Sequence, residues 1–223
     1  MLDSMVVISS CTARKRTHST ANASLASSSV QPTPAKDLYT GKHHILVMSA
    51  VNDLRLAFPD NNIRFFIISA GHGVLSEHEA IMPYDASFNQ YNIRDAINRA
   101  RMLKIRKKLQ GIMMSASAGF FVVGQRYLRA VEGPIGCAPL EIYLTARGVL
   151  TAAYAPGIVW IPAGADMARQ LRVSPRVIGA TMFRKAVDRI VKDRTLRRDG
   201  PSRERTLSTT LMDALQSMSG TAT

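Results

Sequence analysis

One carboxylate follows a motif that could return it to the end of a buried strand. The apolar run 64–70 breaks into Gly71-His72-Gly73, and Met82-Pro83-Tyr84-Asp85 follows shortly afterwards. Glycines at a strand end let a ligand approach the backbone closely, because no Cβ stands in the way. A carboxylate at such a place can act as a general base or stabilise a developing cation. Asp85 is therefore the first candidate for a catalytic residue, although a turn aspartate can also cap its own backbone.

Other polar groups are expected at the same edge. His72 stands between two glycines, so its ring should face the opening, where it could donate to a base, a phosphate or an oxyanion, or bond to a neighbouring carbonyl. Ser69 precedes these glycines, and Ser10-Cys11 follows the first apolar run. A cysteine attacks only as the thiolate, so Cys11 is either a nucleophile beside a base or an inert buried thiol.

The remaining acids and histidines fit structural roles. Glu77 and Glu79 fall in the stretch 76–79, which predicts an exposed helical turn, and His43, His44 and His78 fit surface or helix-packing positions. Nothing recurs at metal-ligand spacing, so we expect no metal. No glycine-rich nucleotide loop opens a helix and no Gly-x-Ser-x-Gly is present. We therefore expect no cofactor and no ordinary α/β-hydrolase.

The charge of the chain favours a polyanionic partner. Its 223 residues include 29 basic and 16 acidic side chains, a formal net charge of +13. Nucleic acid is the commonest partner of such a protein, although a basic protein without a specific partner would share this composition. The stretches 94–108 and 184–205 are the most basic. The cations expected on the DNA backbone from the middle and end of the chain are Arg101, Lys104, Lys108, Arg126 and Arg184.

The sequence predicts a cytoplasmic protein without a membrane partner. Its two cysteines form no Cys-x-x-Cys pair, so neither a disulfide framework nor a zinc finger can be built from them. The start, Met1-Leu2-Asp3-Ser4, carries an acid where a signal peptide needs basic charge. No stretch approaches the roughly 20 apolar residues that span a bilayer.

Alternating strands and helices must position these side chains. Apolar runs predict strands over 5–9, 64–70, 120–123, 141–145 and 157–161, with 150–154 as a further candidate. Helices are expected over 34–39, 43–58, 92–110, 126–131, 174–193 and 207–218. This order indicates a three-layer α/β fold in which helices flank a mostly parallel sheet. We expect one catalytic domain over 1–191, with a mobile serine-rich loop at 17–34, and a basic linker and terminal helix over 192–223.

Three blocks of the sequence resemble a bacterial and phage family that handles nucleobases. They are Ser10-Cys11-Thr12-x-x-Lys15, Pro34-Ala35-Lys36-Asp37-Leu38-Tyr39, and Ser69-Ala70-Gly71-His72-Gly73 leading to Pro83-Tyr84-Asp85. The family includes phage-defence DNA glycosylases that remove modified bases. It is distantly similar to the peroxide-stress DNA-binding protein and to the archaeosine-synthase core. The resemblance covers residues 5–89, and the chain departs from the pattern at Thr12, at His72 and in the long insertion 17–34.

The resemblance implies a sheet like that of uracil-DNA glycosylases and an enzyme that flips a base into a pocket. Asp85 would then stabilise the oxocarbenium-like sugar or orient the attacking water, and Tyr84 would stack on the base or wall the pocket. The base pocket would be formed by Ser10, Cys11, Ser69, His72, Gly73, Tyr84 and Asn89. The nearby contacts to the DNA backbone would be Arg14, Lys15, Lys36 and Tyr39.

We therefore expect a monofunctional DNA glycosylase that excises a modified base from double-stranded phage DNA, for example glucosylated hydroxymethylcytosine, in antiviral defence. No lysine is placed to form a Schiff base, which favours the monofunctional reaction. Two other functions stay open. One is a non-catalytic DNA-binding protein of stress response, in which Asp85 is structural. The other is an enzyme that cleaves the same glycosidic bond in nucleosides or transfer RNA. The sequence does not indicate an oligomeric state.

Overall fold

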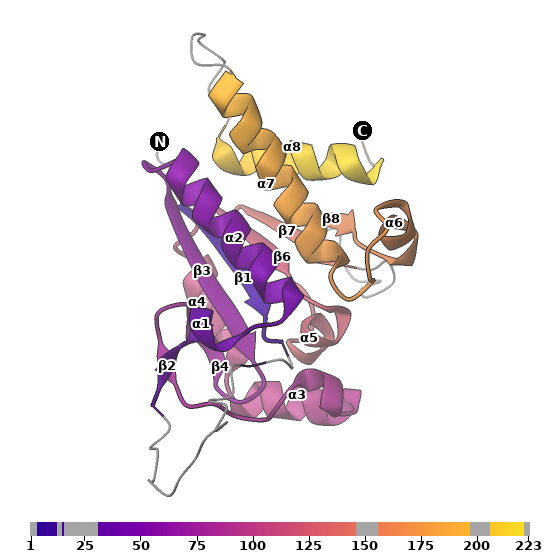
Figure 1. Ribbon diagram of the computed structural model, residues 1–223. Helices are drawn as coiled ribbons and strands as arrows, with labels where there is room; N and C mark the ends of the chain where they lie inside the picture. The colour runs from indigo at the N-terminus through magenta and orange to yellow at the C-terminus, as the bar shows by residue number, and fades with distance from the viewer. Residues whose placement is uncertain (1–3, 13–14, 16–30, 146–155, 197–205, 221–223) are drawn as a thin grey trace, which may run out of the picture.

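A six-stranded sheet forms the centre of the molecule, in the order β4-β3-β1-β6-β7-β8 (Figure 1). The computed structural model describes residues 4–12, 15, 31–145, 156–196 and 206–220. The strands are β1 (Ser4–Ser10), β3 (Asn62–Ser69), β4 (Gly73–Ser76), β6 (Ala118–Val122), β7 (Leu140–Thr145) and β8 (Ile158–Pro162). Five of them run parallel, and β4 pairs antiparallel with β3 at one edge.

The burial of the central strand explains why runs of apolar residues were sufficient to predict the sheet. Met5 to Ser10 are all buried, because β1 pairs with β3 on one side and with β6 on the other. A parallel strand covered on both faces needs a nearly continuous apolar sequence. The five strands predicted from such runs are confirmed, with ends within two residues of those expected. The candidate strand 150–154 lies outside the described residues.

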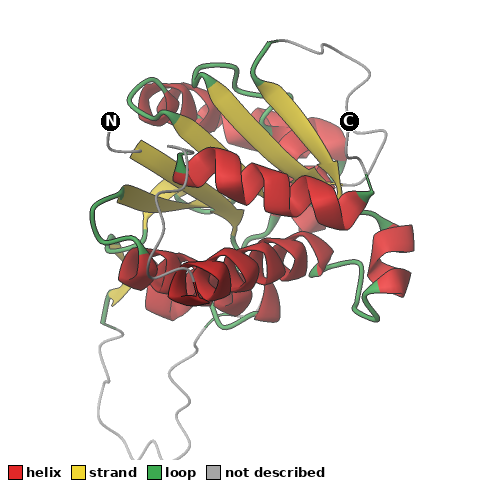
Figure 2. Cartoon of the chain, turned by 90° about the horizontal axis from the view of Figure 1, so that it is seen from above, coloured by secondary structure: helices red, strands yellow, loops and turns green. Residues whose placement is uncertain are grey.

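Helices cover both faces of the sheet, as Figure 2 shows. On one face α2 (Lys42–Ala57) packs along α7 (Ile178–Leu196), while α4 (Ile105–Met113) lies behind β3 in Figure 1. The terminal helix α8 (Leu207–Ser219) packs against α7 and β8. The chain is thus a three-layer α/β protein with a mostly parallel sheet. No helix in the described part of the chain is long and apolar enough to cross a membrane.

Short elements gather where the parallel strands end. Helices α1 (Ala35–Leu38), α3 (Ile93–Met102) and α5 (Gln125–Ala130) lie at this edge, at the bottom of Figure 1. The short strands β2 (Thr33–Pro34) and β5 (Ala80–Ile81) pair antiparallel beside them, and the 3₁₀ turn η1 (Phe88–Gln90) precedes α3. Helix α6 (Ala165–Gln170) follows β8.

The single helix predicted over 92–110 is wrong, because the chain breaks it into α3 and α4. Lys104 takes a left-handed conformation with φ of 52° at the break. The corner packs on the β3–β4 hairpin, where a Cβ on Gly73 would lie 3.2 Å from the carbonyl oxygen of Leu103. Within α3, Ala96 and Ala100 are buried, while Ile93 is 42% exposed.

The exposed helical turn predicted over 76–79 is not found. The chain instead makes a turn directly after β4. Glu77 is only 3% exposed, and Arg55 donates to its two carboxylate oxygens at 2.5 and 3.0 Å. The same guanidinium donates to the carbonyl oxygen of Ile63. Glu77 is therefore a buried structural carboxylate, and it does not compete with Asp85 for a catalytic role.

The boundary predicted at residue 191, between the catalytic domain and the linker, falls inside helix α7. Helix α7 begins at Ile178, after a turn at Ser174 and Pro175, and it continues to Leu196. It therefore takes in the first residues of the predicted linker, whose remainder at 197–205 lies outside the described residues. Helix α8 buries Leu211 and Leu215 in the same apolar core as β1.

A second buried carboxylate organises the loop before β7. Glu141 is fully buried and accepts hydrogen bonds from the backbone N–H groups of Gly136, Cys137 and Ala138 at 2.9, 2.8 and 3.1 Å. The hydroxyl of Tyr143 donates to it at 2.5 Å. Burial and the nearby carboxylate raise the pKa of Tyr143, which therefore stays a donor. Glu141 holds the loop against the sheet.

Candidate active site at the strand ends

The order of the parallel strands marks the end of β1 as the place where a ligand would be expected to bind. The chain leaves β1 for β3 on one side, and the later strand β6 pairs on the other. In open α/β sheets, ligands bind beyond the carboxyl ends of the strands at such a reversal. The three strands end at Ser10, Ser69 and Val122. The segment 84–90 is bonded to Ser69 at the end of β3, to Lys15 and to Tyr127 of α5.

Tyr84 is fixed at the end of β3 by two hydroxyl groups. The Ser69 hydroxyl donates to the Tyr84 hydroxyl at 2.6 Å, and the Tyr39 hydroxyl lies 2.7 Å from it. The Ser69 oxygen in turn accepts from the backbone N–H groups of Gly71 and His72 at 3.1 and 2.9 Å. Burial raises the pKa of both phenols, so these tyrosines are neutral anchors and not bases.

Two cationic or polar groups cover the Tyr84 ring. The ammonium of Lys15 lies 4.2 Å from the ring centre and donates to the carbonyl oxygen of Ala86 at 3.4 Å. The ring of exposed His72 meets Tyr84 edge-on, with the ring centres 4.7 Å apart. The His72 ring nitrogens make no hydrogen bond with any described residue. Of its two expected roles, the bond to a neighbouring carbonyl is therefore not found.

A second buried cluster joins the end of β1 to α5. The hydroxyl of Tyr127, on α5, donates to the carbonyl oxygen of Cys11 at 3.1 Å. It also lies 3.0 Å from the Cys11 sulfur and 3.2 Å from the Ser87 hydroxyl. Cys11 is 4% exposed, and burial raises the pKa of the Tyr127 phenol, which is no base for a thiol. These contacts favour the inert buried cysteine over the nucleophile.

Asp85 lies between these two clusters on a segment fixed at both ends. Its side chain is exposed and makes no hydrogen bond or ion pair with any residue that the structure describes. Ser87 performs the capping in this segment: its hydroxyl accepts from the N–H of Asn89, and its own N–H donates to the Gln90 side chain at 2.7 Å. The contacts of a self-capping turn aspartate are therefore absent at Asp85 among the described residues.

The side chains of three other predicted site residues, Ser10, Asn89 and Lys36, make no hydrogen bond to these clusters, and Gly73 has a different role. Ser10 is buried at the end of β1, and Asn89 is exposed on η1. Gly73 has φ of 83° and is buried under Leu103. Its glycine is therefore required by backbone packing, and the prediction that it lines the pocket is not supported. Lys36 is half-buried on α1, and its carbonyl oxygen lies 2.8 Å from the His44 ring.

The cations predicted to contact the DNA backbone differ in whether they are already bonded to other residues of the protein. Arg184 is bonded to the carboxylates of Asp53 and Asp188 on the α2–α7 face, so its assignment to the DNA surface is not supported. Lys108 donates to the carbonyl oxygen of Val74 at 2.6 Å, and Arg126 donates to that of Tyr91. Arg101 pairs with Glu132, whereas Lys104 is exposed. Arg14 lies outside the described residues.

Sequence reasoning missed Tyr127 and Ser87, and it missed the tie that holds α3 at the site. Arg99 donates through Nε to the carbonyl oxygen of Ala70 at 2.9 Å. Tyr127 lies three residues after Gly124, the glycine that follows β6. A glycine after an apolar run signals a strand end, so this position could have been recognised. Nothing in the sequence indicates that Arg99, among so many cations of its helix, bonds to a strand end.

Replacing Gly71 by alanine should displace Tyr84. A Cβ at this position would lie 2.4 Å from Cδ2 of the Tyr84 ring. Because the ring is fixed through its hydroxyl, we expect the Gly71→Ala protein to lose about 1–3 kcal/mol of unfolding free energy. Urea unfolding measures this loss. As a control, Gly111→Ala meets nothing within 4 Å inside α4 and should gain about 0.5–1 kcal/mol. Equal changes in the two proteins would contradict the proposed crowding.

His43 makes the fold sensitive to mild acid. Its ring lies 3.0 Å from the carbonyl oxygen of Val122, and burial lowers its pKa from 6.5 to about 4. The unfolded chain therefore binds the proton first, so stability falls as the pH drops from 6.5 towards 4. We expect a loss of about 2 kcal/mol at pH 5 relative to pH 7.5 from this residue. His44 acts in the same sense, because burial lowers its pKa too.

Urea unfolding at pH 7.5 and pH 5 tests this expectation. The His43→Gln protein should lose less stability between these two values than the unsubstituted protein does. An unaltered pH dependence in His43→Gln would show that His43 is not responsible.

Comparison with known proteins adds a family but no activity. Residues 6–142 match a family of unknown function, DUF6884. No curated protein matches the chain. Within the described residues, no three histidine, cysteine or acidic side chains gather as a metal site would require. The matched region runs from β1 to β7 and includes every residue of the candidate site named above.

Proposed function

This chain belongs to the DUF6884 family of unknown function, and we propose that it is a DNA glycosylase that flips a modified base out of the duplex and excises it. The observation that carries the proposal is the placement of Asp85. Its exposed carboxylate stands unpaired among the described residues, on a segment fixed by Tyr84 and Ser87 at the ends of the parallel strands. A fixed, unpaired carboxylate can stabilise positive charge as it develops.

The sheet supports the resemblance on which the proposed activity draws. The parallel strands are ordered β3-β1-β6-β7-β8, with the site beyond the end of β1. We propose that this arrangement is related to the sheet of uracil-DNA glycosylases. Two of the three resembling blocks meet directly at Tyr84, through Tyr39 and Ser69, and Lys15 of the first block covers its ring.

In the proposed reaction, the bond between the sugar C1′ and the base nitrogen breaks. The base leaves with the electron pair, and the sugar develops oxocarbenium character beside the Asp85 carboxylate. Water adds to C1′ and gives a proton to this carboxylate, while the departing base takes up a proton from solvent. The Tyr84 ring offers a wall for the flipped base, and His72 offers a ring donor at the exposed side.

The cationic surface supports a DNA substrate over a free nucleoside. A net charge of +13 exceeds what the binding of one nucleoside, which has no phosphate, requires of a protein. DNA has many phosphates, and contacts to them supply most of the affinity of DNA-binding proteins. We propose that the substrate is double-stranded phage DNA with modified cytosines, such as glucosylated hydroxymethylcytosine, and that base removal serves antiviral defence in the cytoplasm.

Incubation with unmodified and phage-modified duplex DNA, followed by mass analysis of the released bases, tests the proposal. A free modified base and matching abasic sites in the DNA are the expected products. Salt-sensitive DNA binding with no released base from any modified DNA would instead identify a non-catalytic binding protein. A preference for nucleosides or transfer RNA over DNA would identify an enzyme of a different substrate class.

A further inference from the structure

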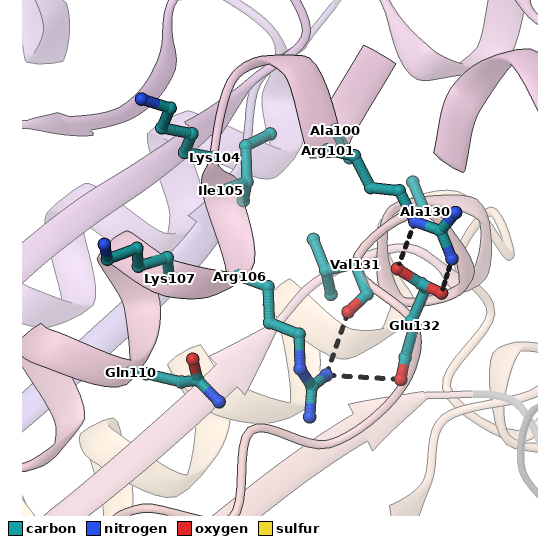
Figure 3. Close-up of a pocket in the computed structure, with 10 residues that line it drawn as sticks. All are labelled: Ala100, Arg101, Lys104, Ile105, Arg106, Lys107, Gln110, Ala130, Val131 and Glu132. Atoms are coloured by element: carbon teal, nitrogen blue, oxygen red, sulfur yellow. Dashed lines mark hydrogen bonds and ion pairs between the residues drawn. The ribbon is translucent and has the colours of Figure 1, made fainter. Parts of the chain in front are cut away.

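A cationic pocket lies between α3, α4 and α5, beside the strand ends and not at Asp85. It encloses about 300 Å³. Figure 3 shows Lys104 and Lys107 on one side of it, with their ammonium groups turned outward, and Arg101, facing Glu132, on the other. With Arg106 also lining it, the pocket has four cations and one carboxylate. Such an excess of positive charge around a concave surface favours an anionic ligand.

Of the four cations of this pocket, the two lysines are available to a ligand, and the two arginines are bonded to other residues. The Arg106 guanidinium donates to the backbone carbonyl oxygens of Val131, Glu132 and Pro134, at 3.0, 3.2 and 2.9 Å. These neutral partners fix its position. The bond to Arg101, together with the charges of Arg101 and Arg106, lowers the pKa of the Glu132 carboxyl, so the Arg106 charge also acts on this carboxylate. Lys104 and Lys107 are exposed and make no ion pair with any residue in the described ranges. Arg101 alone among the four is held by a carboxylate, that of Glu132.

Glu132 occupies the place on Arg101 that a phosphate would take. Its two oxygens accept from Nε and Nη2 of Arg101 at 2.9 and 2.5 Å. Phosphate binds guanidinium with the same paired geometry. The two side chains are 63% and 38% exposed, and exposed ion pairs contribute little to stability. A phosphate group can therefore replace the carboxylate at small cost.

The pocket is connected to the Asp85 site through the strand that ends there. Helix α3 is bonded to the end of β3 by Arg99 and Ala70. The corner between α3 and α4 rests on Gly73, directly after His72. The pocket therefore continues the same edge of the sheet, in the direction of α5. A DNA strand has further phosphates beyond the nucleotide at the Asp85 site, whereas a lone nucleoside has no phosphate to offer this pocket.

We propose that this pocket binds a phosphodiester group of the DNA strand that leaves the Asp85 site, and that Glu132 competes with this phosphate for Arg101. The inference rests on the proposed function, because it takes DNA as the ligand. Glu132 then limits the affinity for DNA in general. Its replacement by an uncharged residue should strengthen binding, which is opposite to the usual effect of breaking a binding-site interaction.

Fluorescence anisotropy of a short unmodified DNA duplex, at several salt concentrations, tests this inference with the full chain. One further phosphate contact adds about 0.9 to the slope of log affinity against log salt, which is about eightfold at 0.1 M salt. We therefore expect Glu132→Gln to bind about five- to tenfold more tightly at 0.1 M salt, with a steeper slope. Replacement of both Lys104 and Lys107 by alanine should weaken binding and reduce the slope by about 2.

Asp188→Asn is the matched control, because it also removes one negative charge that pairs with an arginine, Arg184, but on the α2–α7 face. Its DNA affinity should be unchanged apart from a small effect of net charge. Equal strengthening in Asp188→Asn and Glu132→Gln, no strengthening in Glu132→Gln, or no duplex binding by the unsubstituted protein would overturn the inference. Base release from modified DNA is measured separately. Its absence alone would overturn the glycosylase proposal and leave the pocket standing.

Discussion

Asp85→Asn should abolish release of the modified base while DNA binding persists. The amide keeps the size of the side chain but can neither stabilise an oxocarbenium-like sugar nor accept a proton from the attacking water. General base and charge-stabilising groups of this kind contribute about 10²–10⁴-fold to rates, so we expect a loss of at least about 10²-fold. Counting abasic sites in phage-modified DNA under single-turnover conditions measures this loss.

The control for Asp85→Asn is Asp60→Asn, because Asp60 is also exposed and lies in the turn before β3. This turn lies at the start of the strand and not at its end, so the activity of that protein should match the unsubstituted one. The melting temperatures of the unsubstituted, Asp85→Asn and Asp60→Asn proteins should be similar, because Asp85 has no partner among the described residues to lose. Full activity in Asp85→Asn would refute the assigned role of this carboxylate.

Glu141→Gln should be the most destabilising of the substitutions considered. The amide retains one oxygen for four donors and turns its own N–H groups towards them, inside a fully buried site. Buried donors without an acceptor each cost about 1–3 kcal/mol. We expect a total loss of about 3 kcal/mol in unfolding free energy, measured by urea unfolding at neutral pH.

Glu79→Gln is the comparison for this loss. Glu79 is exposed in the turn after β4 and accepts one long bond from the N–H of Ser76 at 3.4 Å. Surface substitutions of this kind change stability by about 0.5 kcal/mol or less. A similar small change in Glu141→Gln would mean that the loop before β7 does not depend on this carboxylate.

The sheet could be predicted from sequence because its strands are buried on both faces. Runs such as Met5 to Ser9 and Phe120 to Val123 carry enough apolar side chains to identify a strand without any partner in view. The break at Lys104 could not be predicted, because helical periodicity continues through it. What bends the chain there is a tertiary contact, the packing of Leu103 on Gly73.

The site was partly predictable for a related reason. Gly71-His72-Gly73 and Pro83-Tyr84-Asp85 mark strand ends and turns through local chemistry, and the structure brings His72 and Tyr84 together. Whether each charged side chain is paired was not predictable, since its partner lies far away in the sequence. Glu77 is paired by Arg55 of α2, and Arg184 by Asp53. Sequence alone counts such groups as free.

The bond from Lys108 to Val74 also bears on how copies of this protein meet. Strand β4 is the outermost strand on its side of the sheet, and an open edge of this kind invites another chain to add a strand, which leads to aggregation. This edge is only four residues long, and a lysine ammonium occupies one of its carbonyl oxygens at 2.6 Å. A neighbouring chain would have to displace that charge before it could pair, so this contact protects the edge as well as joining α4 to the hairpin.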